Sequence, residues 1–161
     1  MKDKELGKQI EVFDGYSTIK ELKNSCKAVP TGKGIYVVFR ESYENPEFLT
    51  KGTGGLHKGK DLNYPVEELV EKWVYKEQII YIGKTDQSLR KRISAFMKYG
   101  SGYDVAHRGG RAIWQLSDSA DFIVAWKVLP ENVSAREIEF QLIQEFKSQH
   151  LGKHPFANWV D

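Results

Sequence analysis

The chain has almost no cysteine and no long apolar run. Cys26 is the only thiol in 161 residues, which excludes a disulfide within the chain and favours a reducing compartment. No stretch approaches the roughly 20 apolar residues that a membrane-spanning helix needs. The first residues, MKDKELGKQIEVF, are charged throughout and lack the apolar middle of a secretory signal. We therefore expect a soluble, cytoplasmic protein with no membrane partner.

The sequence also lacks a strong net charge of either sign. Lys and Arg number 24 while Asp and Glu number 22, so the net charge of +2 does not by itself indicate a nucleic-acid partner. The charge is uneven, however, because the stretch from Lys84 to Arg111 contains seven Lys or Arg and two Asp, a net charge of +5. Such a stretch can bind phosphates, although many basic helices are merely solvated surfaces.

No repeats or low-complexity tracts interrupt the chain, and its length suits one domain spanning residues 1–161. Branched and aromatic residues predict strands, and apolar residues at helical spacing behind a hydroxyl N-cap predict helices. Strands are predicted at about 34–40, 78–83 and 121–129, and a further short strand is possible at 10–13. One helix is predicted to start near Ser17 or Thr18, and two longer helices are predicted to cover Ser88–Tyr99 and Ser134–His150. We expect an α+β fold, a small three-stranded antiparallel β-sheet flanked by helices.

The connection between the first two strands is far longer than a tight hairpin needs. Its first part, TKGTGGLHKGK (50–60), holds four glycines and the lysines Lys51, Lys58 and Lys60. Its second part, Pro65 to Lys76, has Pro near the start, two Glu in the first turn and apolar residues at helical spacing. We expect a flexible basic loop that can approach phosphates, followed by an amphipathic helix.

Two tripeptides place a tyrosine beside a glycine in strand-like runs, Gly34-Ile35-Tyr36 and Tyr81-Ile82-Gly83. Because side chains alternate along a strand, adjacent strands can bring Tyr36 and Tyr81 to one face of the sheet. Packing alone would explain either tyrosine, since a tyrosine in a strand is a good core residue with a polar tip. A free phenol has a pKa of about 10, so a catalytic base would need a nearby cation, such as Lys84 or Arg92, to favour the phenolate.

The last predicted helix carries two glutamates in different surroundings. The sequence SARE (134–137) fits a capping box, which gives Glu137 a structural role. On a helical wheel, Glu139 falls in the middle of the apolar arc that runs from Ile138 to Ile143. A carboxylate there must be protonated, paired or bound to a metal, because an isolated buried charge is too costly.

Together the two tripeptides resemble the GIY-YIG nuclease superfamily, and the resemblance extends over most of the chain. The sequence SLRKRISAF (88–96) is similar to the family helix that aligns Arg92 with the catalytic arginine, while helical geometry alone leaves Arg90 as a competitor. EFQLI (139–143) matches the family's metal-binding glutamate ahead of a Leu-Ile pair, which implies Glu139. PFAN (155–158) resembles the closing Pro-x-x-Asn, whose asparagine supports the site; for Asn158, capping a turn is the structural alternative.

The resemblance implies phosphodiester hydrolysis by a compact α+β domain. In the family the first tyrosine activates water or shares its proton, and a guanidinium can stabilise charge developing on the phosphorus. The connection between the two strands is short in most members, so residues 40–77 form an inserted segment. The implied catalytic residues are Tyr36, Tyr81, Lys84, Arg92, Glu139 and Asn158.

A single acidic ligand, Glu139, implies a hard cation that keeps several waters, so Mg²⁺ or Mn²⁺ is the expected cofactor. A zinc site at His150 and His154 is disfavoured, because the chain has one thiol and four histidines give a His-x3-His spacing readily by chance.

Arg108 and Arg111 lie on a glycine-permissive stretch that could follow a groove, although a surface loop with solvated arginines is the alternative. We expect a metal-dependent endonuclease acting on DNA, and by analogy a restriction-like one whose specificity comes from residues 40–77 and 100–115. The alternatives are a catalytically idle nucleic-acid-binding module of the same fold, and a nuclease acting on RNA or on branched or damaged DNA. A homodimer is compatible with the sequence. The expected nucleic-acid contacts are Lys51, Lys58, Lys60, Arg90, Arg108 and Arg111.

Overall fold

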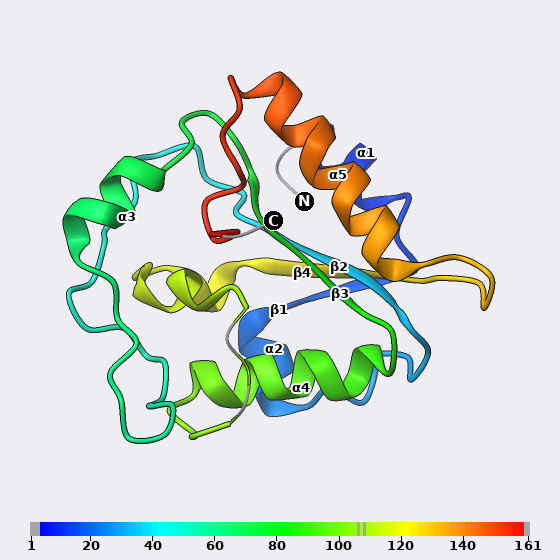
Figure 1. The fold of residues 1–161 in the computed structure, drawn as a ribbon, viewed down its shortest axis with the longest axis horizontal. Helices are drawn as coiled ribbons and strands as arrows, with labels where there is room; N and C mark the ends of the chain where they lie inside the picture. The colour runs from blue at the N-terminus through cyan, green and yellow to red at the C-terminus, as the bar shows by residue number, and fades with distance from the viewer. Residues whose placement is uncertain (1–3, 106, 108, 160–161) are drawn as a thin grey trace.

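A four-stranded antiparallel sheet stands at the centre of the protein, in a computed structural model that describes residues 4–105, 107 and 109–159 (Figure 1). Strand β2 pairs with both β3 and β4, and all six of its residues are buried. Strand β3 lies at the edge of the sheet, so one side of its backbone is open to other partners. The strands are β1 (Gly15–Thr18), β2 (Gly34–Phe39), β3 (Ile79–Thr85) and β4 (Ile123–Val128), in the order β1-β4-β2-β3.

The fourth strand corrects the prediction of a three-stranded sheet, since β1 pairs with β4 over its whole length. The prediction of a short strand at 10–13 is wrong, because Ile10 ends helix α1 (Lys4–Ile10) and the next residues form a turn. Leu6 and Ile10, four residues apart, are both buried against the sheet, which favours the helix. The α+β class itself is confirmed.

Helices cover both faces of the sheet (Figure 1). On one face lie α1 and α5, where Ile143 shares a core cluster with Val37 and Ile82. On the other face lie α2 and α4, and the larger core there includes Tyr36 and Tyr81. No described helix is long and apolar enough to cross a membrane. The remaining helices are α2 (Ile19–Asn24), α3 (Val66–Lys72), α4 (Leu89–Gly100), α5 (Ala135–Gln149) and the short 3₁₀ helices η1 (Arg111–Gln115) and η2 (Ser119–Asp121).

Side-chain caps confirm the predicted starts of three helices. The hydroxyl oxygens of Thr18, Ser88 and Ser134 each accept a hydrogen bond from the backbone N–H three residues later, which opens α2, α4 and α5. The apolar stripe predicted for α4 is buried against the sheet, with Ile93 and Phe96 fully inside. These caps fix where each helix begins, and therefore which residues of α4 and α5 face the edge of β3.

The inserted segment contains the predicted helix, but α3 ends at Lys72 instead of continuing to Lys76. Trp73 leaves the helical conformation and packs its ring against Phe48 and Phe156, at centroid distances of 5.9 and 5.2 Å. Burial of this large ring outweighs the gain from another turn of helix. The segment is thereby anchored to the core of the protein.

Candidate active site

Tyr36 and Tyr81 lie on the same face of the sheet, as the alternation of strand side chains predicted. Their ring centroids are 6.0 Å apart, and both rings contact Phe96 of α4. Gly83 stands opposite Tyr36 in the strand register, and a Cβ at Gly83 would lie 2.7 Å from the Tyr36 hydroxyl oxygen. The glycine of the second tripeptide therefore makes room for the tyrosine of the first.

Both phenols are protonated at neutral pH. Burial raises the pKa of Tyr36, and the positive charge of Arg92, which lowers it, does not compensate. Burial raises the pKa of Tyr81 further, and the neighbouring Tyr36 adds to the effect. The Tyr36 hydroxyl is fully buried, and the polar groups that act on it are the Arg92 guanidinium and the Tyr81 hydroxyl. Arg92 is the nearby cation that a phenolate would need, but the effect of burial on the pKa of Tyr36 is larger than that of Arg92.

The structure brings Arg92 to the tyrosines and directs Arg90 elsewhere. Arg92 acts electrostatically on both phenols, and its Nε is buried without a hydrogen-bond partner among the described residues. Arg90 Nε donates to the Val29 carbonyl oxygen at 2.8 Å, and its Nη2 donates to that of Lys27 at 3.1 Å. Arg90 thus holds the loop before β2, which makes it a poor candidate for a nucleic-acid contact.

Glu139 projects from α5 between the buried residues Ala135 and Ile143, one turn to either side. Its side chain is half-buried, and charges at a distance, not hydrogen bonds or ion pairs with the described residues, act on it. Burial raises the pKa of Glu139, while the positive charges of Lys84 and Arg92 lower it. Lys84 therefore acts on this carboxylate, whereas the sequence suggested that it would act on a phenol.

A cleft of about 520 Å³ joins these groups at the edge of β3, and we call it the edge cleft. Because β3 is the edge strand, α4 on one face of the sheet and α5 on the other can both reach it (Figure 1). Tyr36 does not line the edge cleft and lies behind Tyr81. The lining residues are Tyr81, Lys84, Thr85, Asp86, Gln87, Ser88, Lys91, Arg92, Ala95 and Glu139.

Asn158 lies on the open side of β3 and mimics a pairing strand. Its Oδ1 accepts a hydrogen bond from Ile82 N, and its Nδ2 donates to Ile82 O, both at 2.9 Å. Ala157 N donates to Ile80 O at the same distance. Ile82 separates Tyr81 from Gly83, so Asn158 positions the second tripeptide, and both hydrogen-bonding groups of its side chain are occupied.

Replacing Asn158 by Leu is expected to destabilise the fold by about 2–5 kcal/mol, because it leaves a buried N–H and a buried C=O of Ile82 unpaired. Chemical denaturation measures this free energy of unfolding. Asn45→Leu is the matched control at an exposed position and should change it by less than about 0.5 kcal/mol. Equal stabilities of the two variants would contradict a positioning role for Asn158.

His107 is buried beside the site, where the charge of Arg92 acts on it, although it does not line the edge cleft and the sequence did not indicate its burial. Its ring is buried and stacks on Phe96 at 4.9 Å, and its Nε2 lies 3.0 Å from Gly109 O. Burial, helped by the charge of Arg92, lowers the pKa of His107 to about 3, so the ring is neutral at physiological pH. A carbonyl oxygen only accepts, so Nε2 carries the proton and Nδ1 remains a buried acceptor. The sequence around His107 gives no sign of this burial, because the ring that covers it, that of Phe96, lies on a different element.

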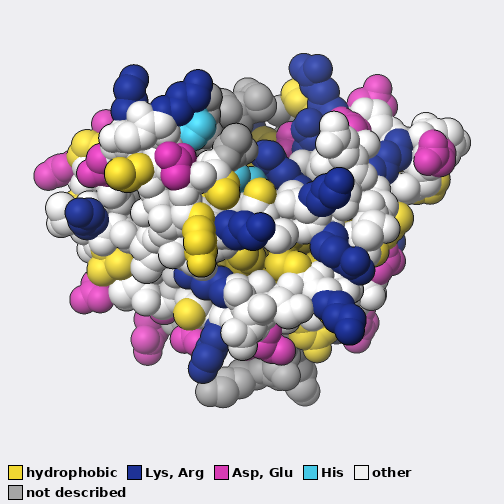
Figure 2. Space-filling model, turned by 90° about the horizontal axis from the view of Figure 1, so that it is seen from below, with side chains coloured by type: hydrophobic (Ala, Val, Ile, Leu, Met, Phe, Trp, Pro, Cys, Tyr) yellow, Lys and Arg dark blue, Asp and Glu magenta, His cyan; other side chains and the backbone are white. Residues whose placement is uncertain are grey.

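Four of the predicted nucleic-acid contacts outside α4 are described, three in the inserted segment and Arg111 at the start of η1. Lys51, Lys58 and Lys60 are exposed, and a tight turn with paired backbone bonds between His57 and Lys60 presents the last two. Figure 2 shows Lys and Arg side chains scattered across the face that α2 and α4 occupy, with Asp and Glu mainly near its rim. Arg108 lies outside the described residues.

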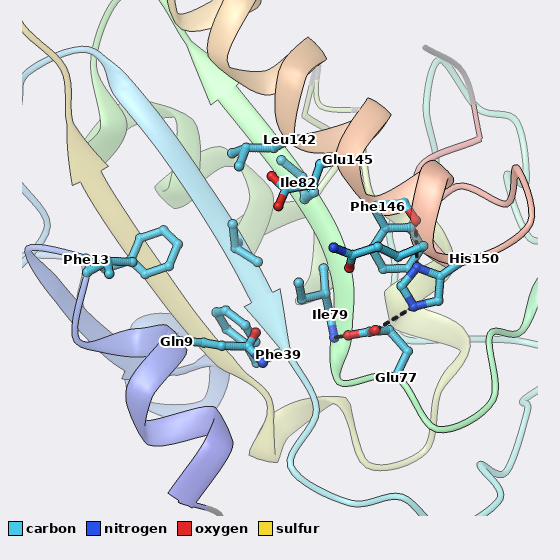
Figure 3. A pocket seen from close by; sticks show the side chains of 13 residues that line it. Gln9, Phe13, Phe39, Glu77, Ile79, Ile82, Leu142, Glu145, Phe146 and His150 are labelled. Carbon is cyan, nitrogen blue, oxygen red and sulfur yellow. Dashed lines mark hydrogen bonds and ion pairs between the residues drawn. The ribbon is translucent and has the colours of Figure 1, made fainter.

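A second pocket, of about 500 Å³, lies on the opposite face between α1, α5 and the sheet (Figure 3). At one end, His150 Nε2 lies 2.7 Å from the Glu77 carboxylate, and His150 Nδ1 lies 2.6 Å from Phe146 O. Both ring nitrogens of His150 therefore have partners within the fold. Among the residues that the structure describes, no three His, Cys, Asp or Glu side chains cluster as metal ligands would.

Comparisons of the chain with protein-family models, with curated protein sequences and with solved structures find no match.

Proposed function

We propose that this protein is a metal-dependent endonuclease of the GIY-YIG type that hydrolyses phosphodiester bonds in DNA. The observation that carries the proposal is the edge cleft, which gathers Tyr81, Arg92 and Glu139 from three separate elements, with Tyr36 directly behind. A binding module of the same fold would have no need of a half-buried carboxylate without a partner. The order of the motifs along the chain resembles that of the GIY-YIG family, which supports the proposal.

Arg92 is assigned to the phosphate. Its guanidinium is partly buried beside two phenols, where charge interactions are stronger than in water. Hydrolysis places additional negative charge on the phosphoryl oxygens as the water oxygen bonds to phosphorus and the ester P–O bond breaks. A fixed guanidinium stabilises that charge without reorganising during the reaction.

The tyrosines are assigned hydrogen bonding and proton sharing. Because burial keeps both phenols protonated, neither supplies a free phenolate base at neutral pH. Tyr81 lines the edge cleft and is the phenol that a bound phosphate or water would meet first. The Tyr36 and Tyr81 hydroxyls act on each other, and a hydrogen bond between them in the substrate complex would link the buried Tyr36 hydroxyl to the attacking water.

Glu139 fits a divalent cation such as Mg²⁺ or Mn²⁺. Its carboxylate lines the edge cleft and has no hydrogen bond or ion pair with the described residues, and the cleft contains a second carboxylate, that of Asp86, which lies 3.8 Å from Lys84 Nζ. Hard cations prefer such oxygen ligands. One or two protein carboxylates are enough for Mg²⁺, because water completes its coordination. When bound, the ion would supply further stabilisation of negative charge on the phosphate.

Incubating the protein with supercoiled plasmid, duplex oligonucleotides and structured RNA, each with Mg²⁺, Mn²⁺ or EDTA, tests this function. We expect nicking or cutting of DNA with either cation and none in EDTA. Cleavage that persists unchanged in EDTA would contradict the metal-dependent mechanism. Binding of DNA without cleavage under every condition would instead identify an idle module, and cleavage of RNA alone would change the substrate class.

A further inference from the structure

Tyr64 of the inserted segment stacks on Trp159, and each of the two rings has a cationic side chain beside it. Its ring lies on that of Trp159, with centroids 3.7 Å apart and an angle of 20° between the planes. Lys72 Nζ lies 5.5 Å from the Trp159 ring. Arg111 Nε donates to the Tyr64 hydroxyl at 2.9 Å, and the Arg111 guanidinium carbon is 4.9 Å from the ring centroid.

The backbone of Tyr64 is fixed as firmly as its ring. Gln115 Oε1 accepts a hydrogen bond from Tyr64 N at 2.8 Å, and Gln115 Nε2 donates to Tyr64 O at 2.9 Å. Gln115 is buried in η1, the helix that begins with Arg111. Tyr64 is therefore a rigid support, because its backbone is tied to η1 and its ring to the segment that holds β3.

Arg111 is half-buried, and only one of its three guanidinium nitrogens has a partner among the described residues. Tyr64 occupies its Nε, and the two terminal nitrogens make no hydrogen bond or ion pair with the described residues. Arg111 also follows Gly109-Gly110 directly, and a Cβ at Gly110 would stand 3.2 Å from the Tyr81 ring. The guanidinium is thus attached to the backbone that borders the ring of Tyr81, the tyrosine that lines the edge cleft.

We propose that Tyr64 is a positioning residue that holds Arg111 toward a phosphate flanking the cleavage site, an inference that rests on the proposed function. A terminal pair of N–H groups matches two phosphate oxygens, and a guanidinium held at Nε keeps this pair in a fixed plane. A free arginine must lose rotamer freedom on binding, whereas an arginine held by Tyr64 has lost it already. The inserted segment thereby contributes to recognition through a residue that itself touches no phosphate.

The test is a double-mutant cycle on binding of a DNA duplex in EDTA, over a series of salt concentrations. Arg111→Ala should weaken binding and reduce the slope of log affinity against log salt by about 0.9, the value for one phosphate contact. Tyr64→Leu should weaken binding and reduce the slope in the parent protein, yet have no further effect in the Arg111→Ala background. Tyr75→Leu, at an exposed tyrosine of the same segment, is the control and should leave affinity and slope unchanged.

Tyr64→Phe covers the case in which Tyr64→Leu does not fold, because it keeps the stack on Trp159 and removes only the acceptor of the Arg111 bond. It should reduce the slope by less than Arg111→Ala, and again only when Arg111 is present. Additive losses, or an unchanged slope in Arg111→Ala, would overturn the positioning role while leaving the nuclease proposal intact. Failure of the unaltered protein to bind any duplex would overturn both.

Discussion

Replacing Glu139 by Gln is expected to abolish metal-dependent cleavage while the protein remains folded. The substitution keeps the shape of the side chain but removes the anionic oxygens that a hard cation requires. A bound cation contributes several kcal/mol of transition-state stabilisation, so the rate should fall by about 10³-fold or more. Single-turnover cleavage of a plasmid at saturating Mg²⁺ measures this loss.

The same substitution should raise the melting temperature in metal-free buffer at neutral pH. Burial raises the pKa of Glu139, so the folded state favours the protonated carboxyl and is penalised once it ionises. The stability that this group contributes is therefore fully present below the pKa of the unfolded chain and is lost as the pH rises through the folded pKa. Glu139→Gln should stabilise the protein at pH 7 and lose that advantage below about pH 4, where both states hold the proton.

Glu137→Gln is the matched control on the same helix. Glu137 is exposed, and its backbone N–H donates to Ser134 Oγ, so the cap survives the change. We expect full activity and a change in stability below roughly 1 kcal/mol. An inactive Glu137→Gln beside an active Glu139→Gln would contradict the placement of the metal at Glu139.

Local patterns were sufficient to predict the elements that carry the edge cleft. The alternation of β2 and β3 placed Tyr36 and Tyr81 on one face, and the structure has them there in contact. The hydroxyl caps fixed the phase of α4 and α5, and with it the direction of Glu139. Such features depend on residues within one turn or one strand of each other, so a single sequence contains them.

Features that depend on distant residues were not predictable. Arg90 and Arg92 flank the same stripe of α4, and only the carbonyl oxygens of the loop before β2 separate their roles. The end of α3 is set by the contact of Trp73 with Phe156, which is remote in the sequence. His107 has no pattern around it that indicates burial. In each case a tertiary contact outweighs local preference.

Replacing Arg92 by Gln is expected to lower the cleavage rate by about 10²–10³-fold, the effect of removing one group that stabilises charge in a transition state. The structure supplies a second readout that does not depend on activity. The charge of Arg92 helps to lower the pKa of His107 to about 3, so that pKa should rise in Arg92→Gln, as NMR titration of the imidazole would measure. The pKa of Glu139 should rise as well, because Arg92 lowers it in the parent protein.

Arg90→Gln separates this role from general loss of positive charge on α4. It removes the hydrogen bonds to the Val29 and Lys27 carbonyl oxygens, so it should reduce stability by about 1 kcal/mol. It should leave the single-turnover rate and the pKa of His107 unchanged, since its guanidinium is directed at the loop before β2. If Arg90→Gln lost cleavage and Arg92→Gln kept it, the guanidinium beside the tyrosines would be structural, and charge stabilisation would have to come from the neighbouring Lys84 or Lys91 of the edge cleft.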